Sequence, residues 1–199
     1  TDLDVHGSYI EFRGLELVEN WHARPGAHHL TFRNIDSARI MVSSASDVRV
    51  LGGDVGPSLD ATSQIKQASD SSLPARNVLM DGVNVHDITR TNADQHLECL
   101  HVMSADGLVI RNSRFDRCSI FGISFNEAGD ANRMRGIVVE NNWFGQILDG
   151  GSYAVHFSSP CKIQLTETPG STTDAGGKLV ITYRARVDLP LSAPPVAQG

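Results

Sequence analysis

Long hydrophobic runs and clusters of basic residues are both missing from this sequence. No apolar stretch approaches the roughly 20 residues that a membrane-spanning helix needs, so no membrane span is expected. Binding to nucleic acid needs concentrated positive charge, because the phosphates must be neutralised. The chain of 199 residues instead carries a formal net charge of −6, which argues against nucleic acid as a partner.

Cysteine is scarce as well. The three cysteines, Cys99, Cys118 and Cys161, have no metal-ligand spacing and cannot all pair with one another. Cys118 falls where other repeats of the chain carry Ile88 and Ile147. We therefore expect the cysteines to be small buried hydrophobic side chains, and the sequence leaves disulfide pairing open.

What the chain does contain is a repeat. Six segments carry an apolar pair two residues apart, then a Gly or Asn, then a second apolar strand. They are Tyr9–Leu17, His29–Ile35, Asp47–Val55, Asn77–Val85, Gly107–Phe115 and Gly136–Phe144. Such recurrence indicates a stacked array in which each unit needs its neighbours to bury its apolar face. Alternation with period two within each unit predicts strands.

One column of the repeat has a specific turn chemistry. Each apolar pair is followed by Gly14, Asn34, Gly52, Gly82, Asn112 or Asn141. A tight bend between two strands needs a residue with positive φ, which Gly adopts freely and Asn better than most residues. Stacked asparagine side chains can also hydrogen-bond to one another along the pile.

A third apolar strand follows the variable loops. Its core pairs are Ile40/Val42, Leu100/Val102, Ile123/Phe125 and Val155/Phe157, with Ile65 in the same stack. Three strands per turn with parallel stacking predict an all-β fold, a right-handed parallel β-helix (a solenoid) of about seven coils with an Asn/Gly ladder at one turn. We expect one domain over residues 1–189, including a last coil from Leu179/Ile181 and Leu189/Leu191. The tail 190–199 is typical of a linker, and the domain is expected to belong to a longer chain with further domains.

These units resemble the pectate-lyase-like right-handed β-helix superfamily. The resemblance is carried by NVLMDGVNVHDI (77–88), GLVIRNSRFDRC (107–118) and GIVVENNWFGQI (136–147), and DQHLECLHV (94–102) is similar to a segment of uncharacterised bacterial secreted β-helix proteins. It implies a secreted or cell-surface protein with polysaccharide as its partner. The sequence shows no leader of the secretory type, but it begins with Thr1, so a leader could have been removed.

The family pattern implies a substrate groove over the third strand, here the one with His101, Ser124 and His156. The lysine or arginine bases and the aspartate calcium ligands of true pectate lyases have no clear counterparts. Calcium is nevertheless the cofactor that the resemblance leaves open.

The shared outward position of these three residues also follows from the alternation of inward and outward side chains along a strand. Leu100 and Val102 point inward, so His101 points outward, in one column with Ser124 and His156. An imidazole near its ordinary pKa can take a proton from a sugar carbon or hydroxyl. The alternative is that a solvent-facing column is polar in any case.

Glu98 and His96 precede this strand. His96, Glu98 and His101 could ligate a metal, but strand alternation turns the first two inward, unless the corner before the strand rotates them, and so opposes that arrangement. In the repeat, Glu98 aligns with Phe121 and Tyr153 of the next two coils, which predicts an aromatic surface beside it. A carboxyl that lies against aromatic surface has a raised pKa and can act as an acid. The alternative is a structural corner carboxylate.

Loop residues supply further candidates. Asp94, Asp60 and Lys66 border the same face, and Glu98 with either aspartate is the best carboxylate pair for a hydrolase, which needs a separation of about 5 to 10 Å.

Arg133 and Arg135 could clamp a uronate carboxylate, although such arginines are often solvated loop charges. Trp21 and Tyr153 are candidates for stacking on sugar rings.

The sequence thus predicts an extracellular carbohydrate-active protein, a polysaccharide lyase or a glycoside hydrolase. The alternative is a non-catalytic polysaccharide-binding, adhesive or structural module.

Overall fold

The computed structural model describes residues 2–59, 61–95, 97–126, 134–149 and 154–157, and after these only the backbone of the strands 162–167, 172–173, 179–180 and 183–188. Throughout these residues the regular structure is strand and not helix, so the fold is all-β. Accordingly, this part of the chain offers no helix with the length and hydropathy needed to cross a membrane.

One sheet has seven strands, and all its neighbours pair in parallel. In spatial order they are β1 (Leu3–Val5), β3 (Asn20–Ala23), β5 (Arg39–Ser43), β9 (Ser63–Lys66), β12 (Leu100–Val102), β15 (Ile123–Phe125) and β18 (Val155–Phe157). No two neighbours are consecutive in the chain, so the chain leaves this sheet and returns to it each time.

A second sheet has eight strands, of which six are parallel. These are β2 (Ser8–Arg13), β4 (His28–Arg33), β6 (Ser46–Leu51), β10 (Ala75–Asp81), β13 (Ala105–Arg111) and β16 (Met134–Glu140). Beyond β16, β22 (Tyr183–Asp188) and β19 (Lys162–Glu167) are added in antiparallel orientation.

The third sheet has five strands and is parallel. It contains β7 (Asp54–Val55), β8 (Ser58–Leu59), β11 (Asn84–Thr89), β14 (Arg114–Cys118) and β17 (Trp143–Phe144). A separate antiparallel pair is formed by β20 (Thr172–Thr173) and β21 (Leu179–Val180).

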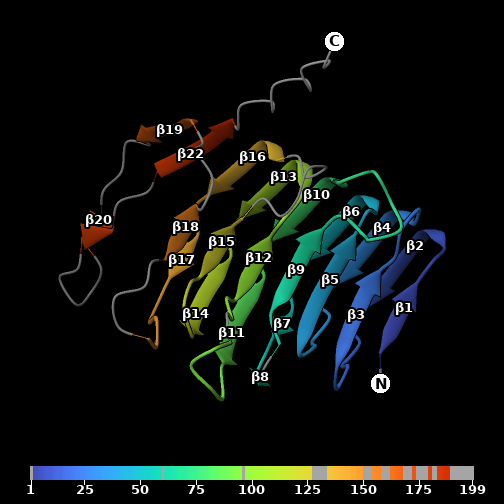
Figure 1. The fold of residues 1–199 in the computed structure, drawn as a ribbon, viewed down its shortest axis with the longest axis horizontal. Coiled ribbons are helices and arrows are strands. Elements are labelled where there is room, and N and C mark those ends of the chain that lie inside the picture. The colour runs from blue at the N-terminus through green and yellow to red at the C-terminus, as the bar shows by residue number, and fades with distance from the viewer. Residues whose placement is uncertain are drawn as a thin grey trace, which may run out of the picture.

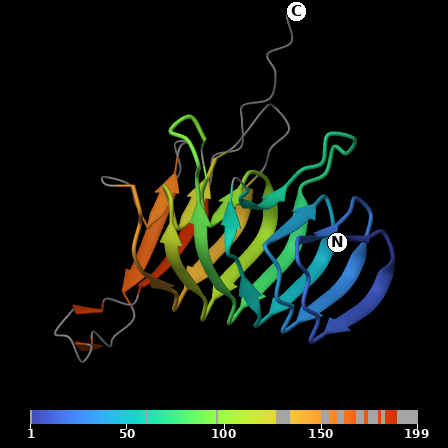
Figure 2. The ribbon, with the colours of Figure 1, turned by 90° about the horizontal axis from the view of Figure 1, so that it is seen from below.

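The chain visits the three large sheets in a fixed order. From β9 to β17, each round passes through the seven-stranded, the eight-stranded and then the five-stranded sheet. Figures 1 and 2 show the strands of each sheet side by side, advancing from the N-terminal end to β18.

The predicted register of the repeat is confirmed in the eight-stranded sheet. Val78 pairs with Leu108 and Leu108 pairs with Ile137, and the second apolar positions pair in the same way. The inward side chains of β4, β6, β10, β13 and β16 are buried, because each is covered by its counterparts on the neighbouring strands. This stacking of like apolar groups is the main source of the fold's stability.

The predicted turn column is also confirmed. All six positions have positive φ, between 51° and 71°, at Gly14, Asn34, Gly52, Gly82, Asn112 and Asn141. The Asn141 amide donates to Oδ1 of Asn112 at 2.6 Å, and the Asn112 amide donates to Oδ1 of Asp81 at 2.7 Å. The amide ladder therefore exists where two asparagines are consecutive in the column.

A second column of positive φ was not predicted from the sequence. It lies at the start of the eight-stranded sheet's parallel strands, at Tyr9, His29, Asp47, Asn77, Gly107 and Gly136. The Tyr9 and His29 rings stack with centroids 4.6 Å apart, and the Asn77 amide donates to Asp47 at 3.0 Å. Side-chain contacts along the stack thus accompany a backbone conformation that is costly for non-glycine residues.

The C-terminal segment differs from the expectation of one more parallel coil. β21 pairs with β20, and β22 pairs with β16 and β19, all in antiparallel orientation. Ile181, Leu189 and Leu191 and the expected linker 190–199 lie outside the described residues.

Candidate functional site

The outward face of the seven-stranded sheet carries one continuous column of side chains. Gln64 of β9 pairs with His101 of β12, His101 with Ser124 of β15, and Ser124 with His156 of β18. Leu100 and Val102 on either side of His101 are fully buried, so His101 points away from the core. The structure confirms that His101, Ser124 and His156 occupy one outward column.

His101 is accompanied by a carboxylate. Oε2 of Glu98 lies 3.8 Å from Nδ1 of His101, and the Glu98 side chain is only 3% exposed, against 19% for His101. Strand alternation would turn the two side chains to opposite faces unless the corner before the strand rotates them, and the contact brings the carboxylate to the imidazole. The segment before β12 is not part of the strand, so the alternation does not extend to Glu98, and the Thr62 hydroxyl donates to the Glu98 carbonyl there.

Ser124 and His156 form the other half of the column. Ser124 is buried, and its hydroxyl lies 3.5 Å from Nδ1 of His156. The His156 ring stacks on Phe121, with centroids 4.2 Å apart and planes inclined by 5°. The aromatic ring fixes the plane of the imidazole, and the hydroxyl gives it a hydrogen-bond partner.

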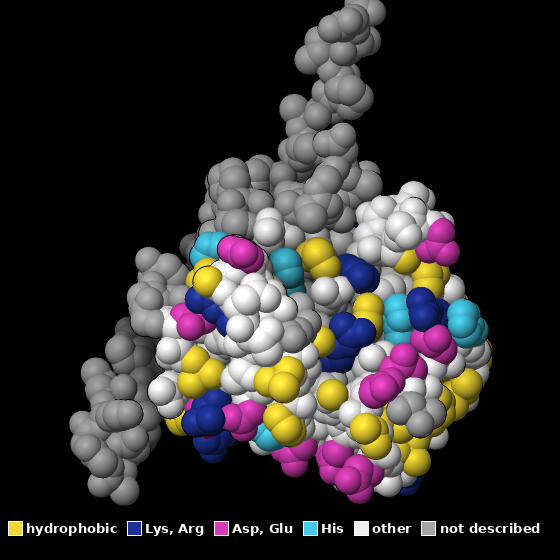
Figure 3. Space-filling view, turned by 60° about the horizontal axis from the view of Figure 1, so that its bottom comes forward, with side chains coloured by type: hydrophobic (Ala, Val, Ile, Leu, Met, Phe, Trp, Pro, Cys, Tyr) yellow, Lys and Arg dark blue, Asp and Glu magenta, His cyan; other side chains and the backbone are white. Residues whose placement is uncertain are grey.

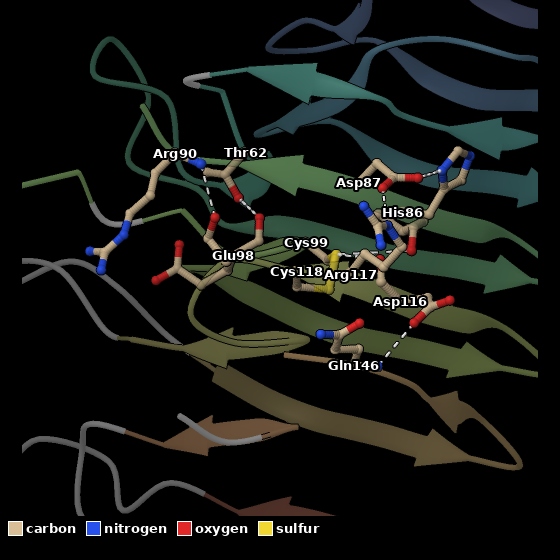
Figure 4. Close-up of a disulfide and its surroundings, with 12 residues drawn as sticks. Thr62, His86, Asp87, Arg90, Glu98, Cys99, Asp116, Arg117, Cys118 and Gln146 are labelled. Carbon is tan, nitrogen blue, oxygen red and sulfur yellow. Dashed lines mark hydrogen bonds and ion pairs between the residues drawn. A yellow bond between two sulfur atoms is a disulfide. The ribbon is translucent and has the colours of Figure 1, made fainter. Parts of the chain in front are cut away.

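A disulfide anchors the segment that carries Glu98. Cys99, which precedes β12, is bonded to Cys118 at the end of β14, and both are fully buried. Figure 4 shows this bond beside Glu98 and Thr62, on the side of the fold where the five-stranded sheet ends. The expectation of unpaired buried cysteines is therefore corrected for these two, while Cys161 lies outside the described residues. Cys118 does stack between Ile88 and Ile147, as predicted.

A cavity of about 740 Å³ opens on the same face, toward the N-terminal end of the sheet. Its lining includes His22, Arg24, Arg39, Met41 and Lys66. Figure 3 shows Lys and Arg (dark blue) and His (cyan) side chains gathered on this part of the surface, with the surface hollowed between them. Since Lys66 belongs to β9, the strand next to β12, the cavity adjoins the column of His101.

Charge pairing and burial determine the protonation states in the cavity. Arg24 donates to both oxygens of Asp4, at 2.8 and 3.0 Å, which lowers the pKa of that carboxyl. Burial, assisted by the charge of Arg24, lowers the pKa of His22 to about 4, so its ring is neutral at pH 7 and bonds to the Ser43 hydroxyl at 2.8 Å. Burial also lowers the pKa of Lys66, and the charges of Arg39 and Arg24 add to this effect.

Of three further predicted site residues, two do not join this face. Trp21 is 0% exposed and stacks on Phe32 with centroids 3.8 Å apart, so it cannot stack on a sugar. Arg135 belongs to the eight-stranded sheet, where it donates to Asp106 at 2.6 Å and cannot clamp a ligand of the seven-stranded sheet. Asp94 lies exposed in the turn after β11, where its amide bonds to Asn92.

Four other candidates, His96, Arg133, Tyr153 and Asp60, lie outside the described residues. In the part of the chain that is described, no group of three or more His, Cys, Asp and Glu side chains is arranged to hold a metal ion. None of the chemistry proposed for this face depends on calcium.

Sequence reasoning missed His22 and Arg39. The signal that could have found them is the alignment of Trp21 and Ala23 with Ile40 and Val42, which pair in register in the structure. That alignment makes β3 and β5 members of the third-strand stack. It also explains why Trp21 is core, because it occupies the position of Ile40.

Comparison of the chain with protein-family models, with curated proteins and with solved structures finds no match. The functional argument therefore depends on the residues of this chain alone.

Proposed function

We propose that this chain is a right-handed parallel β-helix of the pectate-lyase-like kind and that it acts outside the cell on a polysaccharide, along the outward face of the seven-stranded sheet. Between β9 and β17 the chain visits parallel strands of three sheets in a fixed order, which supports the β-helix. The disulfide between Cys99 and Cys118 supports an extracellular location, because disulfides persist in oxidising compartments.

The observation that carries the function is the contact of Glu98 with His101 in the column that continues to Ser124 and His156. A carboxylate next to an imidazole orients the ring and stabilises the charge that the ring acquires when it accepts a proton, which suits the ring to act as a base. Strands in a sheet are about 4.8 Å apart, so the two histidines, separated by Ser124, stand about 10 Å apart. A sugar residue bound over Ser124 would lie between them.

This arrangement suits β-elimination better than hydrolysis. In β-elimination, His101 would take the proton α to a uronate carboxylate, the bond to the leaving sugar oxygen would break, and His156 would give that oxygen a proton. Hydrolysis proceeds through two facing carboxylates, whereas the side chains along this column are two histidines and a serine, with the Glu98 carboxylate beside His101. The lyase is therefore the preferred form of the proposal.

The second candidate function is a non-catalytic polysaccharide-binding module. It is favoured by the burial of Ser124, and by the position of the described cavity, which lies beside the histidine column rather than over it. The two functions share a surface and differ in whether a bond is broken.

One screen separates them. The protein is incubated with uronic-acid and neutral polysaccharides, and the products are followed by the ultraviolet absorbance of unsaturated ends and by reducing ends. New unsaturated ends support the lyase, reducing ends without unsaturation support a hydrolase, and binding without either supports the module. No activity and no binding across the panel would refute the proposal.

Variants then test the residues. His101→Ala and His156→Ala should each lower the rate of elimination about 100-fold or more, as expected for the loss of a general acid or base. His29→Asn is the matched control, because His29 is exposed on the eight-stranded sheet and its positive φ of 54° is tolerated by Asn. Activity that survives both active-site changes would place the chemistry elsewhere.

A further inference from the structure

The cationic and the anionic side chains that line the cavity at the N-terminal end of the seven-stranded sheet differ in burial. Lys66, Arg39 and Arg24 are half-buried, and His22 is buried and neutral. The carboxylates that also line the cavity, Asp2, Asp4 and Asp70, are exposed. Water and salt screen exposed charges more strongly than buried ones, so these carboxylates compensate the cations only in part.

The cations of this cavity are unequally paired. Arg24 is held by both oxygens of Asp4, whereas the guanidinium of Arg39 donates to the side-chain oxygen of Asn20, at 3.3 Å. Among the residues that the structure describes, the Lys66 ammonium has neither a hydrogen-bond acceptor nor a carboxylate partner, and Arg39 has no carboxylate partner. Two cations of one cavity are therefore not ion-paired within the described part of the chain.

This arrangement is costly without a ligand. A half-buried ammonium loses part of its hydration, and the neighbouring positive charges disfavour it further, in agreement with the lowered pKa of Lys66. An anion in the cavity would remove both penalties, because it supplies the acceptor and the opposite charge. Met41, which also lines the cavity, offers apolar surface beside the cations.

We infer that Lys66 and Arg39 form a binding site for an oxyanion group, a carboxylate or a sulfate ester carried by a glycan. The inference rests on the proposed function only for the statement that the ligand is a glycan. Both oxyanions present several oxygens to the ammonium and the guanidinium, and charge-assisted hydrogen bonds of this kind are about twice as strong as neutral ones.

The position of the site fits a polymer that runs across the strands. Gln64 is paired with His101, and Lys66 lies two residues further along β9 on the same outward face. The diagonal between such positions is about 7 to 8 Å. A chain whose charged group sits at Lys66 would therefore carry its next sugar toward His101, so the cavity would select the substrate rather than cleave it.

The direct test is binding of three polymers to the intact protein, measured by calorimetry: polygalacturonate, dextran sulfate and neutral dextran. The inference expects binding of at least one anionic polymer, weakened by salt, and at least tenfold weaker binding of neutral dextran. A preference for polygalacturonate identifies the group as a carboxylate, and a preference for dextran sulfate identifies it as a sulfate ester. Equal binding of all three polymers, or binding of none, overturns the inference.

Two variants locate the site. Lys66→Ala and Arg39→Gln should each weaken binding of the preferred polymer about tenfold or more, the effect expected for loss of a hydrogen bond to a charged group. Arg49→Gln removes one exposed charge from the eight-stranded sheet and should leave binding unchanged. An equal loss in all three variants would indicate nonspecific charge attraction and would overturn the inference.

Chemical labelling gives a test that needs no variant. The chain has three lysines, Lys66, Lys162 and Lys178, which can be compared within one sample. Acetylation followed by peptide mass spectrometry should show that the preferred polymer protects Lys66 at least fivefold more than the other two. Equal protection of all three would overturn the inference.

The outcomes for the inference and for the proposed function can be told apart. Binding of an anionic polymer through Lys66 without cleavage supports the inference and removes the lyase. Cleavage of neutral polysaccharide that is unaffected by Lys66→Ala and Arg39→Gln overturns the inference and leaves a carbohydrate-active enzyme.

Discussion

Cys99 and Cys118 are joined by a disulfide across 19 residues of sequence, with their Cα atoms 5.3 Å apart. The bond connects the segment just before β12 to the end of β14, and so links the seven-stranded sheet to the five-stranded sheet. Because Glu98 is the neighbour of Cys99, the same bond limits the movement of the carboxylate that contacts His101.

Replacing both cysteines, in Cys99→Ala/Cys118→Ala, should lower the free energy of unfolding by about 3 kcal/mol, since a closed loop of this size restricts the unfolded chain by roughly that amount. Urea unfolding without reductant measures the change. The unfolding midpoint of the wild type with reductant should approach the midpoint of the variant. Thiol titration of the unfolded, unreduced wild type should find one free thiol. Three free thiols, or an unchanged midpoint in the variant, would contradict the bond.

Truncation of the two tryptophans should lower the stability by very different amounts. Trp21→Ala removes a fully buried ring from the stack on Phe32 and should cost about 3 to 5 kcal/mol of stability. Trp143 is 46% exposed and lies under the Arg114 guanidinium at 4.1 Å, so Trp143→Ala should cost less than about 1 kcal/mol. Thermal unfolding measures both, and similar losses would show that Trp21 is not in the core.

His22 should make stability depend on pH. Its pKa is lowered from 6.5 to about 4 in the folded protein, so between these values the unfolded chain binds more protons. The corresponding stability is present above pH 6.5 and is lost as the pH falls toward 4, by an amount on the order of 2 to 3 kcal/mol.

The variant His22→Gln retains an amide for the Ser43 hydroxyl but cannot take up the proton. Its free energy of unfolding should therefore fall less than that of the wild type between pH 7 and pH 4.5, as measured by denaturant titration at each pH. Parallel curves for the two proteins would mean that His22 is not buried as a neutral ring.

Asn112 tests the turn column. Asn112→Ala places a Cβ-bearing residue at a φ of 52° and breaks the amide bonds to Asp81 and Asn141. We expect a loss of about 2 to 3 kcal/mol, because a left-handed non-glycine residue costs about 1 to 2 kcal/mol and the hydrogen bonds contribute the rest. Asn112→Gly keeps the backbone free and should lose only about 1 kcal/mol. Equal losses in the two variants would mean that backbone conformation is not limiting there.

The outward column of the candidate site could be predicted from the sequence, but the residues that lie beside this column could not. His101, Ser124 and His156 followed from the alternation of inward and outward positions, which holds as long as the strand continues. Glu98 did not, because it precedes β12, where alternation no longer fixes direction. Arg39 and His22 lie on strands separated from Lys66 by loops of different lengths, so the sequence alone did not place them in one cavity.

The sequence by itself determined the repeat. A period of two residues within each strand and a glycine or asparagine at each bend are local requirements, and they fixed the register of Val78, Leu108 and Ile137. Tertiary structure alone decided which charges meet and which cysteines pair. Those outcomes depend on how corners and loops bring separate rounds of the chain together, and a local pattern carries no information about distances between rounds.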